Sequence, residues 1–279
     1  SIQDVTVLEQ PTDEIPAMDD GEIELRVRAV GLNFRDVLNV LGEYPGGPFP
    51  FGDDCSAAVR VPSIRQNAPL RMGDPAFGLA PGCLATVVRT DERWMVGKPP
   101  CISWRGASTL PTVWSTVHIT LERTGCHRAE RLLVHAASGG VGMVALGYAQ
   151  LLYARICGSA GRPLKHREAL HHQLSDTFAS RDAAAFCVGA CQHLGGARLH
   201  AVLNSLSADF IATSIAMLAS CGDFAEIGKR SVWTAPRMAA GAPWAVYEII
   251  DFAEMVPRDP AWFGGLLSVL GRMVEAGVA

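Results

Sequence analysis

Polar and apolar side chains alternate over residues 22–30, the period of a β-strand with one buried face. The spacing of apolar residues becomes helical over 34–41. Shorter runs at 56–61 and 76–79, bounded by turn residues, predict two further strands. The chain up to residue 115 is therefore predicted to be β-rich.

From residue 110 the apolar spacing lengthens to that of helices, and short apolar runs then alternate with helical patterns. This alternation predicts a parallel, doubly wound sheet, because parallel strands need helical crossovers between them. The predicted strands of this sheet lie at 131–134, 154–160, around Phe178, at 200–203 and at 223–227.

After Gly228 and Lys229 the sequence changes to a loop rich in Trp, Pro and Met, then to a short strand at 244–251 and an amphipathic helix from Pro260. This last part is predicted to return to the β-rich segment. Neither end resembles a natural terminus, because the chain begins without Met and stops at what reads as a helix exit. We therefore expect it to be a piece of a larger protein.

The most informative stretch is 132–145, where an apolar strand enters a turn of small residues that opens into an apolar helix. This geometry aims backbone N–H groups and a helix N-terminus at a pyrophosphate. Ala137 stands where the full glycine pattern would have its first glycine, and a Gly-rich turn by itself is also compatible with an ordinary helix start. The residues predicted to bind the cofactor here are Ser138, Gly139, Gly140, Val141 and Gly142.

The end of the second predicted strand of this unit favours NADPH over NADH. NAD-binding units carry an Asp or Glu there to hold the ribose 2′-hydroxyl, and this chain has none. Ser159, Arg162 and Lys165 follow instead, and a hydroxyl with two cations suits a 2′-phosphate. The alternative is that the two cations belong to a solvated helix start.

The composition excludes several classes of function. The 279 residues are 49% hydrophobic and 19% charged with a formal net charge of −4, so there is no basic footprint for nucleic acid or an anionic membrane. No apolar run approaches the roughly 18 residues of a membrane span, and the start is no signal peptide. Eight cysteines without a C-x-x-C pair indicate no zinc cage, and they predict free thiols in a reducing, cytoplasmic compartment.

Five segments of the chain resemble the medium-chain dehydrogenase/reductase superfamily. Within it, the chain is most similar to the enoyl reductase domains of modular polyketide synthases and related fatty acid synthases. The resemblance runs from about residue 20 to residue 275. The segments that carry it are 27–38, 41–46, 134–143, 202–206 and 226–229.

The resemblance implies a fold and a division of the chain. The fold is a Rossmann-type doubly wound parallel sheet domain together with a β-rich, GroES-like substrate domain. Residues 1–115 would form the first part of the substrate domain and 116–230 the NADPH-binding domain. Residues 231–279 would return to the substrate domain and be truncated.

The resemblance also implies a reaction: NADPH reduces a trans-2-enoyl thioester to the saturated acyl thioester, with hydride added at the β carbon and a proton at the α carbon. The implied partners are an acyl carrier protein that carries the thioester and the neighbouring domains of the synthase. No metal is implied, since the stretch 51–55 lacks the His that zinc-dependent relatives place there.

Three residues match the family's proton donors. Tyr44 follows the first helix, Lys229 follows the strand at 223–227, and Asp251 ends the last strand. A phenol, or an ammonium held by a carboxylate, can donate a proton or hydrogen-bond to an enolate. The structural alternatives are a loop tyrosine packed on Pro45, a solvated lysine and a strand-end aspartate.

Asn33 and Asn204 lie in loops expected to face the nicotinamide, where an amide could hold the carboxamide or the substrate carbonyl, and Gly228 is also predicted to bind the cofactor. An Asn in a turn is more commonly part of an Asx-turn. Two other functions stay open: a free-standing quinone or enone oxidoreductase, and a structural reductase domain that no longer turns over.

Overall fold

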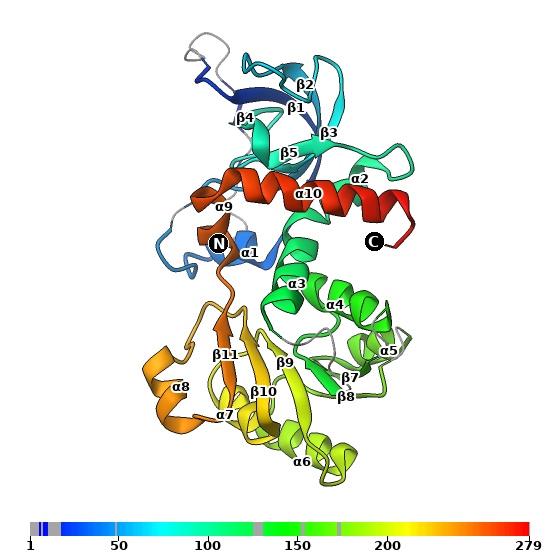
Figure 1. The fold of residues 1–279 in the computed structure, drawn as a ribbon, viewed down its shortest axis with the longest axis vertical. Coiled ribbons are helices and arrows are strands. Elements are labelled where there is room, and N and C mark those ends of the chain that lie inside the picture. The colour runs from blue at the N-terminus through cyan, green and yellow to red at the C-terminus, as the bar shows by residue number, and fades with distance from the viewer. Residues whose placement is uncertain are drawn as a thin grey trace. The chain divides into compact units, whose positions relative to one another are not determined.

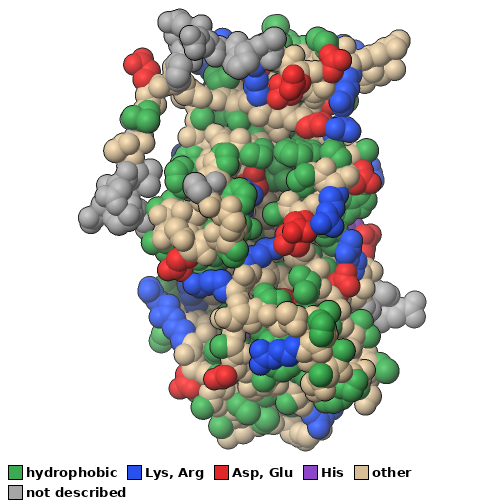
Figure 2. Space-filling view, turned by 90° about the vertical axis from the view of Figure 1, so that its left-hand side faces the viewer, with side chains coloured by type: hydrophobic (Ala, Val, Ile, Leu, Met, Phe, Trp, Pro, Cys, Tyr) green, Lys and Arg blue, Asp and Glu red, His purple; other side chains and the backbone are tan. Residues whose placement is uncertain are grey.

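Two compact units make up the chain in the computed structural model, which describes residues 6, 8–10, 18–47, 49–124, 131–151, 154–171 and 174–278 (Figure 1). Unit 1 comprises Ser1–Ser115 together with Phe252–Ala279, and unit 2 comprises Thr116–Asp251. Among the described residues, no helix combines the length and the apolar character needed to cross a bilayer. Side chains of both charge signs are interspersed on the face shown in Figure 2.

Unit 1 is built on a five-stranded antiparallel sheet in the order β4-β1-β2-β3-β5. The predicted strands and the predicted first helix are present, and Ile23 and Leu25 of the first strand are buried in the core. The strands are β1 (Glu22–Gly31), β2 (Asp54–Val61), β3 (Pro75–Leu79), β4 (Val87–Asp91) and β5 (Met95–Gly97). The helices are α1 (Phe34–Val40), η2 (Glu92–Trp94), α2 (Trp104–Ser108), α9 (Phe252–Arg258) and α10 (Pro260–Glu275), with α3 (Pro111–Arg123) continuing into unit 2.

The amphipathic helix predicted from Pro260 is α10, which packs on unit 1 against η2 and β5. The Asp259 side chain caps it by accepting a hydrogen bond from the N–H of Trp262 at 2.9 Å. A Cβ at Gly264 would lie only 2.8 Å from the carbonyl oxygen of Arg93, so glycine permits this close approach. Its buried residues recur at helical spacing: Phe263, Leu266, Leu267, Leu270 and Val274.

Unit 2 is the predicted doubly wound parallel sheet, with six strands in the order β11-β10-β9-β6-β7-β8. The chain runs outward from β6 to β7 and β8 on one side, and then to β9, β10 and β11 on the other. The strands are β6 (Arg131–Val134), β7 (Arg155–Ala160), β8 (Asp176–Ala179), β9 (Leu199–Asn204), β10 (Leu218–Glu226) and β11 (Val246–Ile249). The helices are α4 (Gly140–Leu151), α5 (Pro163–His171), α6 (Ala183–Leu194), α7 (Asp209–Ala216) and α8 (Ala235–Gly241).

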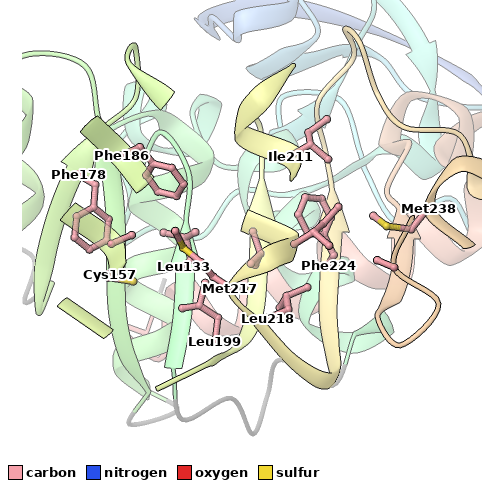
Figure 3. Close-up of a cluster of buried hydrophobic side chains, with 14 residues drawn as sticks. Leu133, Cys157, Phe178, Phe186, Leu199, Ile211, Met217, Leu218, Phe224 and Met238 are labelled. Atoms are coloured by element: carbon pink, nitrogen blue, oxygen red, sulfur yellow. The ribbon is translucent and has the colours of Figure 1, made fainter. Parts of the chain in front are cut away.

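Each face of this sheet carries its own core. Successive strand residues point to opposite faces, so Leu132 and Val134 pack with α4, while Leu133 lies in the cluster with Phe186 of α6. Figure 3 shows the second cluster, in which Phe224 and Met238 bring β10 and α8 together with α6 and α7. A sheet covered on both faces explains why its strands read as nearly continuous apolar runs.

The chain returns to unit 1 at Phe252, and not at residue 231 as predicted from the sequence. Residues 231–251 stay in unit 2 because β11 pairs in parallel with β10. Met238 and Ala242 also pack in the core of unit 2. The segment rich in Trp, Pro and Met, predicted to be a loop, contains the short helix α8. A proline stands in the first turn of this helix, where a backbone N–H would have no partner within the helix.

Candidate cofactor and catalytic site

The predicted strand–turn–helix geometry is present where β6 leads into α4. Ala136 adopts a left-handed conformation with φ 49°, and the N–H of Gly139 donates to its carbonyl oxygen at 2.8 Å. A Cβ at Gly142 would lie 2.6 Å from the Ala136 oxygen and from the carbonyl carbon of Ala137. Because both neighbours are backbone, only glycine lets α4 begin this close to the turn.

The missing first glycine of the pattern has a local explanation. Ala137 is fully buried, and a Cβ placed on Gly158 of β7 would lie 2.7 Å from the Ala137 Cβ. The turn and β7 therefore pack together with only the methyl group of Ala137 between them. The glycine that makes room for this methyl group is Gly158 of β7, and not a glycine in the turn itself.

Ser159 lies at the end of β7, as predicted, but its side chain points to the inside of this turn. Its side chain is fully buried, the N–H of Ala136 donates to its Oγ at 3.1 Å, and His135 Nδ1 lies 3.0 Å from the same oxygen. His135 Nε2 is 2.8 Å from Ser214 Oγ, and burial lowers the pKa of His135 to about 3, so the imidazole is neutral. The prediction that Ser159 binds the 2′-phosphate is wrong for this side chain, which holds the turn from inside the sheet.

The two predicted cations do lie beyond the end of β7. Arg162 precedes α5, Lys165 is in its first turn, and both are exposed. Arg181, which follows β8, was missed: its Nε lies 3.1 Å from the position of a Cβ on Gly161. Strands β7 and β8 are parallel neighbours, so residues that follow the two strands lie close together. A basic residue shortly after the third predicted strand is therefore the sequence signal by which Arg181 could have been found.

Lys229 and Asp251 are brought together at the carboxyl ends of β10 and β11. Lys229 Nζ lies 2.8 Å from Asp251 Oδ1, with 26% and 36% of the two side chains exposed. The two strands are parallel neighbours, so the residues that follow them meet at one edge of the sheet. The Gly-rich turn follows β6 at the same side of the sheet, where the carboxyl ends of the parallel strands lie.

Asn204 and Gly228 face inward, toward Glu226. Asn204 is fully buried, and its Nδ2 donates to Glu226 Oε2 at 2.6 Å and to the carbonyl oxygen of Leu206 at 2.7 Å. The N–H of Gly228 donates to Glu226 Oε1 at 2.6 Å. The prediction that the Asn204 amide faces the nicotinamide is therefore wrong, because both of its donor hydrogens are used inside the chain.

In unit 1, Tyr44 lies in the loop between α1 and β2, where an arginine holds it. The Arg35 guanidinium is 5.9 Å from the centroid of the Tyr44 ring and 5.4 Å from that of Phe49, and it pairs with Asp53. The two rings meet edge to face at 5.5 Å. These contacts fix a loop tyrosine by cation–π and aromatic packing.

Asn33 has a structural role in unit 1. It precedes α1, where its N–H donates to Asp36 Oδ2 at 2.8 Å, and its Nδ2 donates to Asp54 Oδ2 at 3.0 Å. Thr112 Oγ1 donates to the other Asp54 oxygen at 2.6 Å. Burial raises the pKa of Asp54 to about 7, and the amide of Asn33 serves to satisfy this carboxyl group.

Cysteine and histidine do not gather into a metal centre in the part of the chain that the structure describes, where no group of three His, Cys, Asp or Glu side chains could hold an ion. Cys187 and Cys191 are four residues apart in α6 and so share one face of this helix. Cys126 lies outside the described residues.

A six-stranded parallel sheet with a glycine turn at its switch point, together with a β-rich antiparallel unit, defines the medium-chain dehydrogenase/reductase class. No family model matches the chain. The solved structure of CurK enoyl reductase aligns with 97% of this chain and 84% of its own, at 30% identity and a TM-score of 0.86. The chain belongs to the enoyl reductase family of polyketide synthases.

Two curated relatives are polyketide synthase proteins much longer than this chain. The highly reducing polyketide synthase ZEA2 of Gibberella zeae is 32% identical over 93% of this chain and 11% of its own length. The pikromycin polyketide synthase component PikAII of Streptomyces venezuelae is 34% identical over 92% of this chain and 7% of its own. The chain thus spans a small part of the synthases that it matches.

Proposed function

We propose that this chain is the NADPH-dependent enoyl reductase domain of a polyketide or fatty acid synthase. It reduces a trans-2-enoyl thioester presented by an acyl carrier protein, beside the other domains of the synthase. The observation that carries the proposal is the Lys229–Asp251 ion pair of 2.8 Å, which lies at the same edge of the sheet as the Gly-rich turn.

The residues of the turn fit a dinucleotide. Gly142 lets α4 begin directly against the backbone of Ala136 and Ala137, where any side chain would clash, so the turn and the N-terminus of α4 stay close together. The first N–H groups of a helix have no partner within it, and we assign the pyrophosphate to those of Gly140, Val141 and Gly142. The reduced nicotinamide supplies the hydride for the β carbon when it is bound.

Lys229 supplies the proton in this proposal. The Asp251 carboxylate holds the ammonium group in one place, so the ammonium can hydrogen-bond to the thioester carbonyl as negative charge develops there. The proton then passes to the α carbon of the enolate and leaves a neutral amine. Because 26% of the Lys229 side chain is exposed, solvent can restore the proton.

The cofactor preference is expected to depend on the cations beyond β7 and β8. Replacing Arg162 or Arg181 by Ala removes a charge-assisted contact to the 2′-phosphate, which should weaken NADPH binding by about 1–3 kcal/mol. Binding of NADH, which has no 2′-phosphate, should stay as it is in the wild type. Fluorescence titration with both cofactors checks this, and equal losses for the two cofactors would contradict the assignment.

Tyr44 is proposed to direct the proton to one face of the α carbon. The resemblance implies that a tyrosine here goes with the S configuration when the substrate carries an α-methyl group. Tyr44→Val should keep measurable turnover, because Lys229 still supplies the proton, and should change the configuration at the methyl-bearing carbon. Chiral analysis of the reduced 2-methyl thioester measures the change.

Tyr44→Phe is the matched control, since it keeps the ring that packs on Phe49 and Arg35 and removes only the hydroxyl. If the phenol directs the proton, both variants alter the product. If Tyr44 serves packing alone, Tyr44→Phe behaves as the wild type, and Tyr44→Val loses stability without any change of configuration.

The proposed function is tested by offering the purified chain NADPH with crotonyl-pantetheine and, separately, with a 1,4-benzoquinone. Loss of NADPH absorbance with the thioester, together with formation of butyryl-pantetheine, is the expected result. Rapid reduction of the quinone without any reduction of the thioester would replace the proposal by the quinone oxidoreductase alternative. Cofactor binding without either reaction would indicate a structural domain.

A further inference from the structure

Glu226 is a fully buried carboxyl group at the last position of β10. Its Oε2 accepts a hydrogen bond from Asn204 Nδ2 and its Oε1 accepts one from the N–H of Gly228, both at 2.6 Å. A Cβ at Gly228 would lie 2.6 Å from the same Oε1, so the loop passes the carboxyl group with no room for another side chain. The bond to Gly228 fixes the backbone one residue before Lys229.

The same residue also joins the strands on both sides of it. The N–H of Ile250 donates to the carbonyl oxygen of Glu226 at 2.9 Å, directly before Asp251. Asn204 ends β9, and its carbonyl oxygen accepts from the N–H of Ile227 at 2.9 Å. Glu226 thereby links the ends of β9, β10 and β11, the last two of which lead to the two members of the ion pair.

We propose that Glu226 is a positioning residue: it fixes the loop that carries Lys229, so that the ammonium group is held on Asp251 at the edge of the sheet. The catalytic meaning of this role rests on the proposed function. The positioning itself concerns only groups of unit 2 and can be measured without turnover.

The charges around Glu226 support this role. Burial raises its pKa to about 7, while the hydrogen bonds from Asn204 and Gly228 and the charge of Lys229 act in the opposite direction. On β11, burial raises the pKa of the Tyr247 phenol, and the charge of Glu226 adds to this shift. A buried carboxyl group is costly unless its oxygens accept hydrogen bonds, and here both oxygens do so.

Glu226→Gln is the informative variant because it keeps the size of the side chain. Both partners of the carboxyl group are N–H donors, so an amide NH₂ must face one of them and one bond is lost. Glu248→Gln is the matched control: it makes the same change on the neighbouring strand, at a side chain that is 36% exposed and pairs with Arg123.

The readout is the mobility of the Lys229 side chain. The sequence has three lysines, Lys98, Lys165 and Lys229. Reductive methylation with ¹³C-formaldehyde, which keeps the charge, therefore gives three lysine methyl resonances besides that of the N-terminal amine, and Lys→Arg variants assign them. In Glu226→Gln the Lys229 resonance should sharpen and move toward that of the exposed Lys165. The resonances of Lys98 and Lys165 should stay in place, and Glu248→Gln should leave all three unchanged.

An unchanged Lys229 resonance in folded Glu226→Gln would overturn the proposal. If Glu226→Gln does not fold, Gly228→Ala provides the same test: it keeps the carboxyl group and forces a methyl group against Oε1 at 2.6 Å. The Lys229 resonance should then respond as described for Glu226→Gln, and an unchanged resonance in folded Gly228→Ala would also overturn the proposal.

The kinetic arm separates this inference from the proposed function. In Glu226→Gln, kcat for crotonyl-pantetheine should fall by roughly tenfold to a hundredfold, the cost of misplacing a reacting group by about 1 Å, while the KM for NADPH stays as in the wild type. A fall in kcat with no change at Lys229 would contradict positioning through that residue. If the wild type reduces no thioester, the proposed function fails, and the methyl resonances still decide whether Glu226 holds Lys229.

Discussion

Replacing Lys229 by Met is expected to slow reduction of the enoyl thioester by about 10²–10⁴-fold, the range for loss of a positioned acid. Asp251→Asn should cost a similar factor, because the ammonium at 2.8 Å loses the carboxylate that orients it. Groups that act as one unit are not additive. The double variant should therefore be about as slow as either single variant, with NADPH affinity largely retained in all three.

Single-turnover rates with preformed NADPH complexes measure this cycle, because they isolate the chemical step from release of product. Arg258→Met is the control: Arg258 pairs with Glu254 on an exposed face of α9 at 2.9 Å, and breaking that surface pair should leave the rate unchanged. If the losses of the two single variants multiply in the double variant, Lys229 and Asp251 act independently, and the coupled role assigned to them is wrong.

The second large effect is expected at Gly142. The Cβ of Gly142→Ala would lie 2.6 Å from backbone atoms of Ala136 and Ala137, so α4 must move away from the turn. Overpacking of this kind typically costs about 1–3 kcal/mol of stability. NADPH binding should weaken as well, because the N–H groups assigned to the pyrophosphate move with α4. Urea denaturation and cofactor titration measure the two losses.

Gly147→Ala in the same helix is the matched control. Nothing lies within 4 Å of a Cβ at Gly147, and alanine in an exposed helix position is more favourable than glycine by about 1 kcal/mol. This variant should therefore be more stable than the wild type and should bind NADPH equally well. Equal effects of the two substitutions would contradict the close approach at Gly142.

The sequence predicts the parallel sheet and the cofactor turn well because both depend on local patterns. Apolar runs, helical spacing and a Gly-rich junction are properties of neighbouring residues, and β6, α4 and β7 form where these patterns lie. The pairing of Lys229 with Asp251 could also be predicted, since residues that follow adjacent parallel strands meet at the carboxyl ends of those strands.

Local sequence patterns do not predict which way a polar side chain at the end of a strand points. Ser159 and Asn204 stand where a ligand-binding residue is expected, yet each turns inward to a buried polar partner, His135 in one case and Glu226 in the other. Buried polar groups must find partners, and those partners lie on other strands. The sequence alone does not say which of two polar residues is buried.

Arg181 and the segment 231–251 were missed for a related reason. Arg181 lies beside Gly161, next to Arg162, only because β8 pairs with β7. The segment 231–251 belongs to unit 2 only because β11 pairs with β10 as an edge strand of the sheet. Both depend on strand order, which is set by long-range packing.

In the proposed reaction, hydride reaches the β carbon and a proton reaches the α carbon of an enoyl thioester. The most direct measurement is the reduction of crotonyl-pantetheine with NADPH deuterated at nicotinamide C4 in ordinary water, and with unlabelled NADPH in heavy water. We predict that the butyryl product carries deuterium at C3 in the first experiment and at C2 in the second. Deuterium from the cofactor at C2, or butyryl-pantetheine without deuterium from either source, would contradict the proposed reaction.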